Sequence, residues 1–474
     1  MRFSRLLPLL LVTALILSAC ITISPAGTVT PVPQLSPAAS TSSPAPVSGP
    51  SPTPAPSLTP TPLPTIAVAP SALHGVDIRV WQAFAGPAAD LFASQVGEFN
   101  ASNQWGIVVT PGGYGDYTSL LDAVNATLSA GNAPDLVAAL PEQTLAWQAG
   151  GKLVDLQPYI DDPQYGLGKD AVADIPSVFW AQDNVAGKQL GLPAQRSARF
   201  IFYNQSWAHE LGFPNPPRTA DEFRLQACAA NASYLKDTDP KNDGYGGWIV
   251  DTNWQTTYSW LLAFGGGVVD GANYTLRTDP NLTALQFIKG LFDSHCAWIS
   301  TELTPFDSFA RRSALFISAD LSEVQMEMAS MKNLKNSDEW TVLPFPGPQA
   351  SVVVAYGPSY SLLRSTPEKQ LAAWLFARWL LSPESQAQWV EQTGLFPLRH
   401  AVLDQVGSYL LASPQWGAAN ATLPQAQNVP QLASWRKVRY VLEDGLNVLF
   451  QENLTLDKLP ALLVEMDSTV QELK

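Results

Sequence analysis

The chain has 474 residues, of which 27 are basic and 41 are acidic, so its formal net charge at pH 7 is −14. Charged residues make up only 14% of the sequence, well below the quarter that is typical of soluble proteins, while tryptophan is abundant with 15 copies. The acidic balance excludes the basic surface that a nucleic-acid-binding protein needs, and it disfavours a strongly anionic ligand unless a local pocket overrides it.

The first twenty residues have the form of a secretory signal that ends in a cysteine. Arg2 and Arg5 precede an apolar run at residues 6–17, and Leu-Ser-Ala-Cys closes the segment at residues 17–20. The run is shorter than the roughly 20 residues that cross a bilayer. The last four residues resemble the bacterial lipobox, in which the cysteine becomes the lipidated N-terminus. We expect Cys20 to carry lipid; an ordinary signal peptide and a membrane anchor are the alternatives.

A long tether follows this cysteine. Residues 21–74 include 14 prolines and no Asp, Glu, Lys or Arg. Such a stretch cannot bury enough apolar surface to offset its chain entropy, so we predict that it is disordered. Its Ser-Pro and Thr-Pro steps favour extended polyproline conformations, with a reach of at most about 170 Å. The sequence therefore predicts a folded part, residues 75–474, that is tethered to a membrane and kept at a distance from its surface.

The folded part opens with strands that alternate with helices. Strands are predicted at residues 76–81, 107–109 and 135–140, with helices between them at 88–99 and 119–130. The third strand is apolar on both faces, which is typical of a parallel sheet covered by helices on both sides. Further strands are predicted at 191–193 and 198–203.

From about Asp221 the pattern becomes mostly helical. Short strands are predicted at 314–318 and 341–344, and one or two strands at 351–363. Helices are predicted at 368–381, 384–393, 430–450 and 456–473. About 400 residues follow the tether, enough for two or three domains with a large core.

Two cysteines remain if Cys20 carries lipid. Cys228 and Cys296 belong to an exported chain, and a single remaining pair in an oxidising compartment is typical of a disulfide. We therefore predict a Cys228–Cys296 bond; two buried free thiols are the alternative.

Four stretches of the folded part carry a recognisable pattern. They are residues 114–117 with 130–137, residues 187–193 with 202–204 and 216–223, residues 374–387 with 393–399, and residues 429–432 with Trp435. In this order and spacing they resemble the extracellular solute-binding proteins of family 1, the sugar receptors of ABC importers. One departure is Ala220, where the family usually has a packing tryptophan.

The resemblance implies a fold and a function. The fold is an α/β, two-lobe, periplasmic-binding-protein-like fold of type II, with the ligand cleft between lobes that close by hinge bending. We expect the first lobe at residues 75–196 and 350–382, and the second at 197–349 and 383–474. The implied function is a monomeric, membrane-tethered extracytoplasmic receptor that binds a sugar or oligosaccharide and delivers it to the permease subunits of an ABC importer.

An enzyme is the competing interpretation. The four histidines, His74, His209, His295 and His400, form no zinc-protease motif, and no Gly-x-Ser-x-Gly motif occurs. Residues 237–244 resemble a calcium loop but fail at two ligand positions, so we interpret them as an Asx-rich turn and expect no metal or cofactor. A secreted carbohydrate-active enzyme and a receptor for a non-sugar solute remain alternatives, since glycosidase carboxylates have no fixed spacing.

Sugar binding needs aromatic rings for stacking and planar polar groups that bond hydroxyls. The ends of the first three strands, which face the expected cleft, are followed by Phe84, Tyr114 and Glu142. Gln195 and Arg196 lie where the chain should first cross between lobes. For Phe84 a core ring is the alternative, and for Glu142 a solvated loop acid.

The second lobe and the return crossing are expected to supply four more ligand-binding residues. By resemblance, Trp254 falls near a stacking aromatic, Asp320 ends a strand at a common contact position, and Trp435 opens a helix where sugar receptors often place an aromatic. Tyr356 lies at the return crossing. For Trp254 the alternative is packing between helices.

The lipid anchor gives the first testable prediction. Cys20→Ala should release the protein from membranes without unfolding it, because lipid on this residue is the expected attachment. Membrane fractionation with a carbonate wash measures this, and a circular dichroism spectrum checks the fold. A variant that stays in the washed pellet would contradict lipid anchoring.

Overall fold

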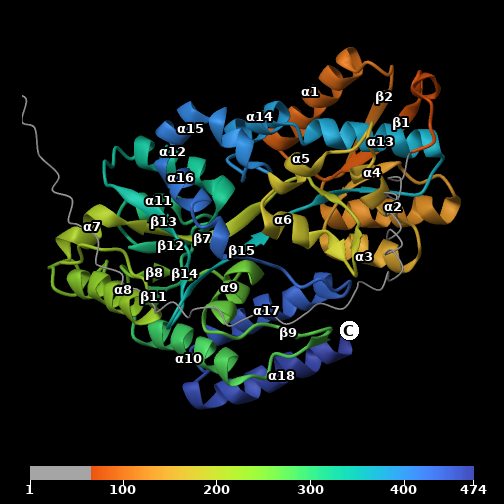
Figure 1. Cartoon of the computed structure of the whole chain (residues 1–474). Coiled ribbons are helices and arrows are strands. Elements are labelled where there is room, and N and C mark those ends of the chain that lie inside the picture. Colours follow the sequence, from red (N-terminus) through yellow and green to blue (C-terminus); the bar gives the residue numbers. More distant parts are fainter. Residues whose placement is uncertain (1–65) are drawn as a thin grey trace, which may run out of the picture. The chain divides into compact units, whose positions relative to one another are not determined.

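The computed structural model describes residues 66–474. The predicted signal segment, the lipidation site Cys20 and most of the tether lie outside the described residues. The described chain forms two lobes, each built around its own β-sheet (Figure 1).

The first lobe contains a five-stranded sheet in the order β2-β1-β3-β16-β6. The strands are β1 (Asp77–Gln82), β2 (Val108–Gly113), β3 (Leu136–Ala139), β6 (Leu192–Pro193) and β16 (Ser359–Leu362). The first three are parallel, while β16 and β6 join in antiparallel pairing. All four side chains of β3 are buried, alternately in the cores on the two faces of the sheet, as its apolar pattern predicted.

Helices cover both faces of this sheet. α1 (Pro87–Ser102), α13 (Pro367–Leu380) and α14 (Pro383–Thr393) contribute to one core, and α2 (Tyr117–Ala130) and α3 (Pro141–Ala149) to the other. α2 begins at Asp116, whose carboxylate accepts bonds from two backbone amides, and it ends at Gly131 with φ 73°. The remaining short elements are η1 (Pro70–Leu73), α4 (Gln157–Ile160), α5 (Lys169–Ala173), α6 (Ser177–Gln182), β4 (Asn184–Val185) and β5 (Lys188–Gln189).

The second lobe contains an eight-stranded sheet in the order β11-β8-β12-β7-β15-β14, with β13 also pairing β7 and β17 pairing β15. These strands are β7 (Ser197–Asn204), β8 (Trp248–Ile249), β11 (Ala297–Trp298), β12 (Phe316–Asp320), β13 (Trp340–Leu343), β14 (Phe345–Pro346), β15 (Ser351–Tyr356) and β17 (Ala426–Asn428). Every side chain of the central strand β7 is buried, so this strand is the middle of the lobe.

Helices pack around this second sheet. α9 (Trp254–Ala263), α10 (Asp279–Asp293), α17 (Trp435–Leu449) and α18 (Leu459–Glu472) contact one another and lie together at the bottom of Figure 1. The others are α7 (Gln205–Glu210), α8 (Ala220–Tyr234), α11 (Phe306–Ala310), α12 (Val324–Asn333), α15 (Gly407–Ala412) and α16 (Pro414–Asn420). Short connecting elements are β9 (Val269–Asp270), β10 (Asn273–Tyr274), η2 (Leu321–Glu323), η3 (His400–Asp404), η4 (Leu423–Gln425) and η5 (Leu456–Lys458).

The lobe boundaries differ from the expected ones. β15 pairs with β7 in the second sheet, so the chain returns to the first lobe at Gly357, not at residue 350. α14 packs on α1 in the first lobe, where Gln95 bonds both Ser385 and Trp389. The apolar run at 351–363 predicted the strands but not that each belongs to a different sheet.

The tether also ends earlier than predicted. Residues 66–74 pack against the first lobe: Leu73 is fully buried, and the Ile66 amide donates to Asp162 Oδ2 over 2.6 Å. The reason is that Ile66, Val68 and Leu73 supply enough apolar surface for burial despite the neighbouring prolines. The predicted helix at 430–450 likewise starts later, at Trp435.

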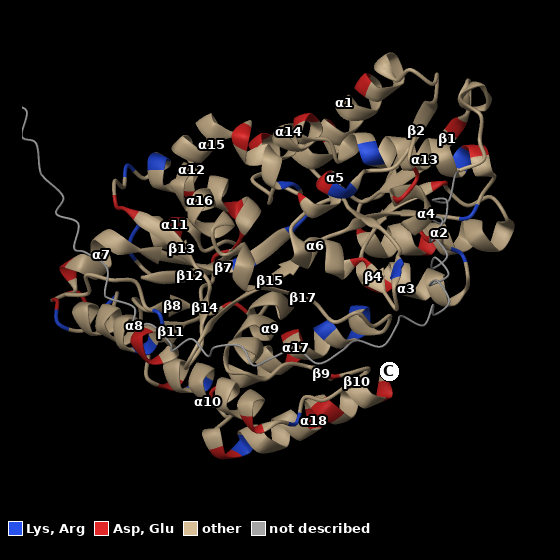
Figure 2. Cartoon of the chain, viewed as in Figure 1, with Lys and Arg blue, Asp and Glu red and all other residues tan. Residues whose placement is uncertain are grey.

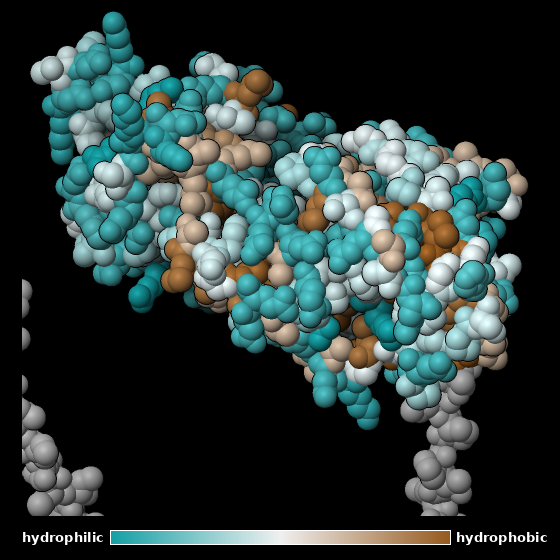
Figure 3. Space-filling view, turned by 90° about the horizontal axis from the view of Figure 1, so that it is seen from above, coloured by the Kyte–Doolittle hydropathy of each residue, from teal (hydrophilic) through white to brown (hydrophobic). Residues whose placement is uncertain are grey.

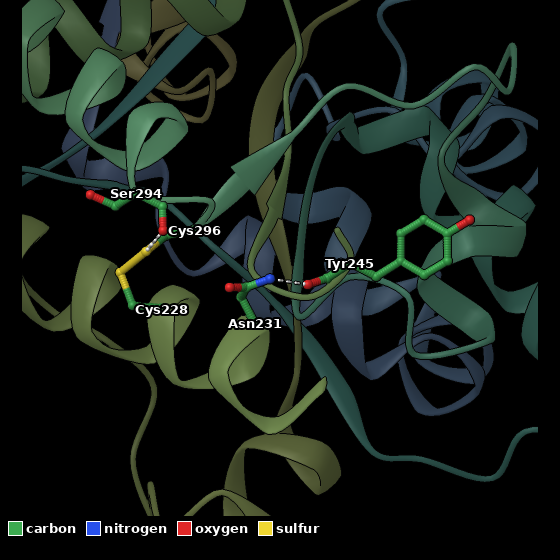
Figure 4. The surroundings of a disulfide bond; sticks show 5 residues. All are labelled: Cys228, Asn231, Tyr245, Ser294 and Cys296. Atoms are coloured by element: carbon green, nitrogen blue, oxygen red, sulfur yellow. Dashed lines mark hydrogen bonds between the residues drawn. A yellow bond between two sulfur atoms is a disulfide. The ribbon is translucent and has the colours of Figure 1, made fainter. Parts of the chain in front are cut away.

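The predicted disulfide is confirmed. Cys228 on α8 is bonded to Cys296 beside β11, with their Cα atoms 4.4 Å apart (Figure 4). A loop of this size stabilises the fold by about 4 kcal/mol in the chain-entropy model. One turn along α8, Asn231 donates to the carbonyl of Tyr245 over 2.8 Å, which fixes the end of the Asp-rich turn. Within that turn Asp237 and Asp239 accept backbone amides, as an Asx-rich turn requires.

Residues 66–474 contain no helix long and apolar enough to span a bilayer, and no group of three His, Cys, Asp or Glu side chains arranged to hold a metal ion. Acidic and basic residues are spread over both lobes (Figure 2). The face drawn in Figure 3 is mostly hydrophilic, with small separate apolar patches.

Glu327 on α12 is an unusual core residue. Its side chain is fully buried, and neither carboxylate oxygen has a hydrogen-bond partner. Burial raises its pKa to about 9, and the negative charge of Asp307 adds to the shift. The carboxyl group is therefore protonated in the folded protein at neutral pH, whereas it ionises near its ordinary value of 4.5 in the unfolded chain.

The second prediction concerns the variant Glu327→Gln. Between about pH 4.5 and pH 9 the folded parent binds one more proton than the unfolded chain, so its stability falls with rising pH. Glutamine removes this dependence, and the variant should exceed the parent in unfolding free energy by roughly 3 kcal/mol at pH 7. Urea unfolding at several pH values measures the difference. Glu384→Gln, at an exposed position on α14, is the matched control; parallel curves for Glu327→Gln and the parent would contradict the prediction.

Candidate binding site between the lobes

Three chain segments connect the two sheets. Gln195 and Arg196 lie between β6 and β7, and Gly357 and Pro358 lie between β15 and β16. The third segment follows α14 and contains Phe396; the chain then reaches α16, which packs on β13 of the second lobe. Residues at these crossings are the ones that both lobes share.

A pocket of about 380 Å³ lies beside the crossings, between the lobes. The first lobe contributes Phe84 and Tyr117, the second contributes Ser322 and Met326, and Gln195 lies at the crossing. Its other lining residues are Ala83, Ala85, Pro87, Ala88, Gln325, Gln392, Thr393 and Leu395, so no ionised side chain lines it. Its polar groups are amides and hydroxyls.

Gln195 lines this pocket, and its side-chain amide has an unused donor. Its side chain is partly exposed, yet its Nε2 atom is itself buried and has no hydrogen-bond partner in the described structure. An unpaired buried amide costs about 1–3 kcal/mol, so it is suited to bind a ligand oxygen. This places Gln195 where the sequence predicted a ligand contact, and the contact itself stays a prediction.

The two aromatic candidates of the first lobe, Phe84 and Tyr114, lie in different environments. Phe84 is 6% exposed, packs edge-on against Phe92 and Trp389, and lines the interlobe pocket, so it is a core ring at the pocket wall. Tyr114 is partly exposed and packs on Trp81 with ring centroids 5.1 Å apart. It does not line the interlobe pocket.

Arg196 is enclosed by the crossings. It is fully buried, and its guanidinium donates to Asp183 over 2.9 Å, to Ser359 over 2.9 Å and to the carbonyl of Pro358 over 2.6 Å. Burial lowers the pKa of Arg196, and Asp183 opposes that shift. Its own carbonyl accepts the amide of Phe396 over 3.0 Å, so Arg196 touches all three connecting segments. This gives it a structural role at the hinge; a ligand contact stays a prediction.

A charged cluster lies in the second lobe at the carboxyl ends of β8 and β12. Arg199 bonds Asp251 over 2.6 Å, Asp320 over 2.9 Å and Glu323 over 3.3 Å. Burial alone would lower the pKa of Arg199, but these carboxylates outweigh it and raise the pKa. A second pocket, of about 280 Å³, opens beside Arg199, Asp251 and Glu323. Three carboxylates around one guanidinium leave this end of the sheet electronegative.

Three predicted aromatic residues join this cluster. Tyr356 donates its hydroxyl to Asp320, and its ring lies 5.7 Å from that of Trp254. Trp254 in turn meets Trp435 edge-on, with centroids 5.5 Å apart. Trp254 is 9% exposed and Trp435 only 1%, so packing dominates both environments. The structure therefore brings Trp254, Asp320, Tyr356 and Trp435 together, while their contact with a ligand stays a prediction.

An ion pair connects the two lobes across the site. Glu142, at the start of α3, lies 3.3 Å from Arg439 on α17, and both side chains are largely buried. Burial raises the pKa of Glu142, and the charge of Arg439 opposes this. Arg439 also lies over the ring of Trp254, with its guanidinium carbon 6.0 Å from the centroid. Glu142 is thus not a solvated loop acid, and it connects the first lobe to the aromatic cluster.

Sequence reasoning missed several residues of this site, among them Arg199, Asp251 and Arg439. Two of them had a usable signal. Asp251 lies two residues after a short strand, where parallel strands present polar side chains. Arg439 lies four residues after Trp435, on the same helical face, and Figure 2 shows the basic residues gathered at one end of α17. Arg199 lies within a strand that reads as apolar, and its partners come from distant segments.

Comparison with known proteins agrees with this architecture. A family model described as bacterial extracellular solute-binding protein matches residues 94–424, well over half of the chain. The sn-glycerol-3-phosphate-binding periplasmic protein UgpB of Yersinia pestis is 22% identical over 432 residues, which cover 82% of this chain and 91% of that protein.

Solved structures show the same fold. The sugar-binding protein MalE from Xanthomonas citri is 19% identical with a TM-score of 0.72, covering 84% of this chain and 97% of that one. The cyclic alpha-maltosyl-1,6-maltose binding protein from Arthrobacter globiformis is 20% identical with a TM-score of 0.68, covering 83% and 98%. The expected two-lobe α/β fold is confirmed.

The third prediction concerns the buried pair at the crossings. Arg196→Met should lower the unfolding free energy by about 3–5 kcal/mol, because it leaves Asp183 buried without its partner. Adding Asp183→Asn should restore at least about 1 kcal/mol, since it removes the unpaired charge. Guanidinium unfolding followed by tryptophan fluorescence measures both.

Arg224→Met is the matched control for Arg196→Met. Arg224 forms an exposed ion pair with Asp221, so its loss should change stability by less than about 1 kcal/mol. Equal losses for the two arginine variants would contradict the role assigned to Arg196.

Proposed function

Because the chain belongs to the bacterial extracellular solute-binding protein family, we propose that it is an extracytoplasmic receptor that binds an uncharged sugar or oligosaccharide and delivers it to an ABC importer. The observation that carries the sugar assignment is the interlobe pocket, which no ionised side chain lines and whose lining includes Gln195, with its buried and unpaired Nε2 donor. Amides and hydroxyls of this kind bond neutral hydroxyl groups. Aromatic walls such as Phe84 and Tyr117 suit the apolar faces of sugar rings.

The charges around the site support a neutral solute over a phosphate ester. The relative UgpB is named for sn-glycerol-3-phosphate, so an anionic solute is the second candidate. In this chain, however, Arg199 is surrounded by three carboxylates and Arg439 is paired with Glu142. A phosphate would have to displace a carboxylate from either arginine, which leaves a buried charge unpaired.

The remaining parts of the proposal concern chemistry and attachment. We propose that the protein acts as a receptor without catalysis, as its family consists of solute-binding proteins. The lipobox-like residues support attachment through lipid on Cys20, and a monomer suffices for a site made by two lobes of one chain. The permease subunits of an importer are the expected macromolecular partner.

A ligand screen tests this function. Mono- and oligosaccharides and sn-glycerol 3-phosphate are added separately to the purified protein, and the melting temperature is followed. A ligand at a hundred times its dissociation constant stabilises the folded state by about 2.7 kcal/mol, enough to see. A shift with a neutral sugar supports the proposal, and a shift with glycerol phosphate alone would reject the neutral class. Release of reducing sugar from a glycoside panel would show an enzyme instead.

The fourth prediction uses the sugar that this screen identifies. Gln195→Leu keeps the approximate size of the side chain but removes the free donor, so affinity should fall about tenfold or more. The melting temperature of the ligand-free variant should stay the same or rise, because the lost amide has no partner in the described structure and its buried donor is unpaired in the parent. Isothermal titration and a melting curve on the same sample measure both. Gln104→Leu, at an exposed turn, is the control; equal affinity in the parent and Gln195→Leu would reject this contact.

A further inference from the structure

A further pocket lies at the boundary between the lobes, beside the tip of the β9–β10 hairpin, and we call it the hairpin pocket. Its volume of about 540 Å³ is in the usual range for a small-molecule site. The first lobe supplies Ala181 on α6, and the second supplies Tyr258 on α9, the hairpin tip and residues 428–432. It shares no lining residue with either pocket of the candidate site.

Asn428 is a lining residue of the hairpin pocket with a free acceptor. Its backbone lies in β17 beside Ala355 of β15, and its Nδ2 atom donates to the carbonyl of Val178 on α6 over 2.9 Å. These contacts fix the side-chain amide, yet its Oδ1 atom is buried and has no hydrogen-bond partner within residues 66–474. An unpaired buried acceptor is unfavourable, so this oxygen is suited to accept a hydrogen bond from a ligand.

Tyr258 supplies a second polar group. Its side chain is buried and packs against Trp435, with ring centroids 5.6 Å apart. Burial raises the pKa of the Tyr258 hydroxyl, so the hydroxyl keeps its proton at neutral pH and can donate it to a hydrogen bond. The third polar side chain of the lining is Gln431, whose Nε2 atom already donates to the carbonyls of Ala181 and Gln182 over 2.9 Å each.

The rest of the hairpin pocket is mostly apolar, and its walls are held in place. The hairpin turns through Gly271 at φ 59°, a backbone conformation that a two-residue hairpin turn favours at this position. Tyr274 fixes the hairpin, because its hydroxyl accepts from Ser434 over 3.2 Å and its carbonyl accepts from Gln471 over 2.8 Å. The larger apolar lining residues are Val269, Val429, Pro430 and Leu432.

We propose that the hairpin pocket is a second binding site, for a small neutral molecule with an apolar body and one hydroxyl group, an alcohol or a phenol. One hydroxyl can donate to Oδ1 of Asn428 and accept from the hydroxyl of Tyr258. A sugar fits less well, because most of its hydroxyls would face the apolar lining without a partner. An ionic ligand is disfavoured, since no charged residue is among the lining residues that the structure describes.

Methyl NMR spectra of the full-length protein with cyclohexanol test this site. Cyclohexanone is the matched probe, because it has nearly the same size but cannot donate a hydrogen bond to Asn428. Cyclohexanol should shift the methyl signals of Val269, Val429 and Leu432 in a saturable titration, and it should bind at least about fivefold more tightly than cyclohexanone. Equal affinity of the two probes, or no saturable shift, would overturn the proposal. Shifts confined to Met326 and Leu395 would also overturn it, since the alcohol would then occupy the interlobe pocket.

A pair of tyrosine variants tests the second polar group. Tyr258→Phe removes only the hydroxyl, so cyclohexanol should bind about fivefold more weakly. Tyr440→Phe makes the same change at an exposed position on α17 outside the pocket and should leave this affinity unchanged. Unchanged affinity in Tyr258→Phe would overturn the proposed contact. The comparison of cyclohexanol with cyclohexanone needs no variant, so it decides the proposal even if Tyr258→Phe lowers the melting temperature.

Discussion

The buried guanidinium of Arg196 is the constraint on which the arrangement of the two lobes depends. The guanidinium donates to the carbonyl of Pro358 in one crossing. The backbone of Arg196 lies in another crossing, and the Arg196 carbonyl accepts the amide of Phe396 in the third. A charge buried this deeply is stable only while it keeps its carboxylate partner, Asp183. Gly357 makes this packing possible: at φ 152°, a side chain there would lie 2.2 Å from the carbonyl oxygen of Gln195. The lobes therefore share one rigid point, and hinge motion must occur around it.

The pairing of buried charges also shapes the binding site. Three arginines at the site are matched by carboxylates from other elements: Arg196 by Asp183, Arg199 by Asp251 and Asp320, Arg439 by Glu142. Only the pair with Glu142 spans from the first lobe to α17, so separating the lobes exposes that pair and leaves the other two intact. The pocket between the lobes is left with uncharged groups, which suit a hydroxyl-rich solute.

Local patterns predicted the first three strands with the helices between them and the helices α13, α14, α17 and α18, whereas α8, α9, α10 and α12 were given no bounds and the lobe of β15 was wrong. The alternating and apolar patterns at residues 76–140 predicted three strands of the first sheet, because hydrophobic period and helix capping are local properties of the sequence. Strand β15 was placed in the wrong lobe because an equally apolar strand can join either sheet. In the site, candidates at strand ends were brought together, but Glu142 and Arg439 are 297 residues apart, and nothing local indicates such a partner. The end of the tether was predicted too late in the chain. The high proline content obscured the fact that Ile66, Val68 and Leu73 pack against the first lobe.

The strand order of the first sheet sets a sequence of events for a chain that is exported from its N-terminus. β3 and β6 both pair with β16, which is made of residues 359–362, and not with each other. Until those residues have crossed the membrane, β6 has no neighbour and one edge of β3 stays open, while the whole second sheet up to β13 is already outside. Joining strands so far apart in sequence is slow, because a large loop must close first. An unpaired strand edge is in turn a template for pairing with other chains. The interval between the emergence of β3 and of β16 is therefore the period when this edge of the sheet is most open to pairing with other chains.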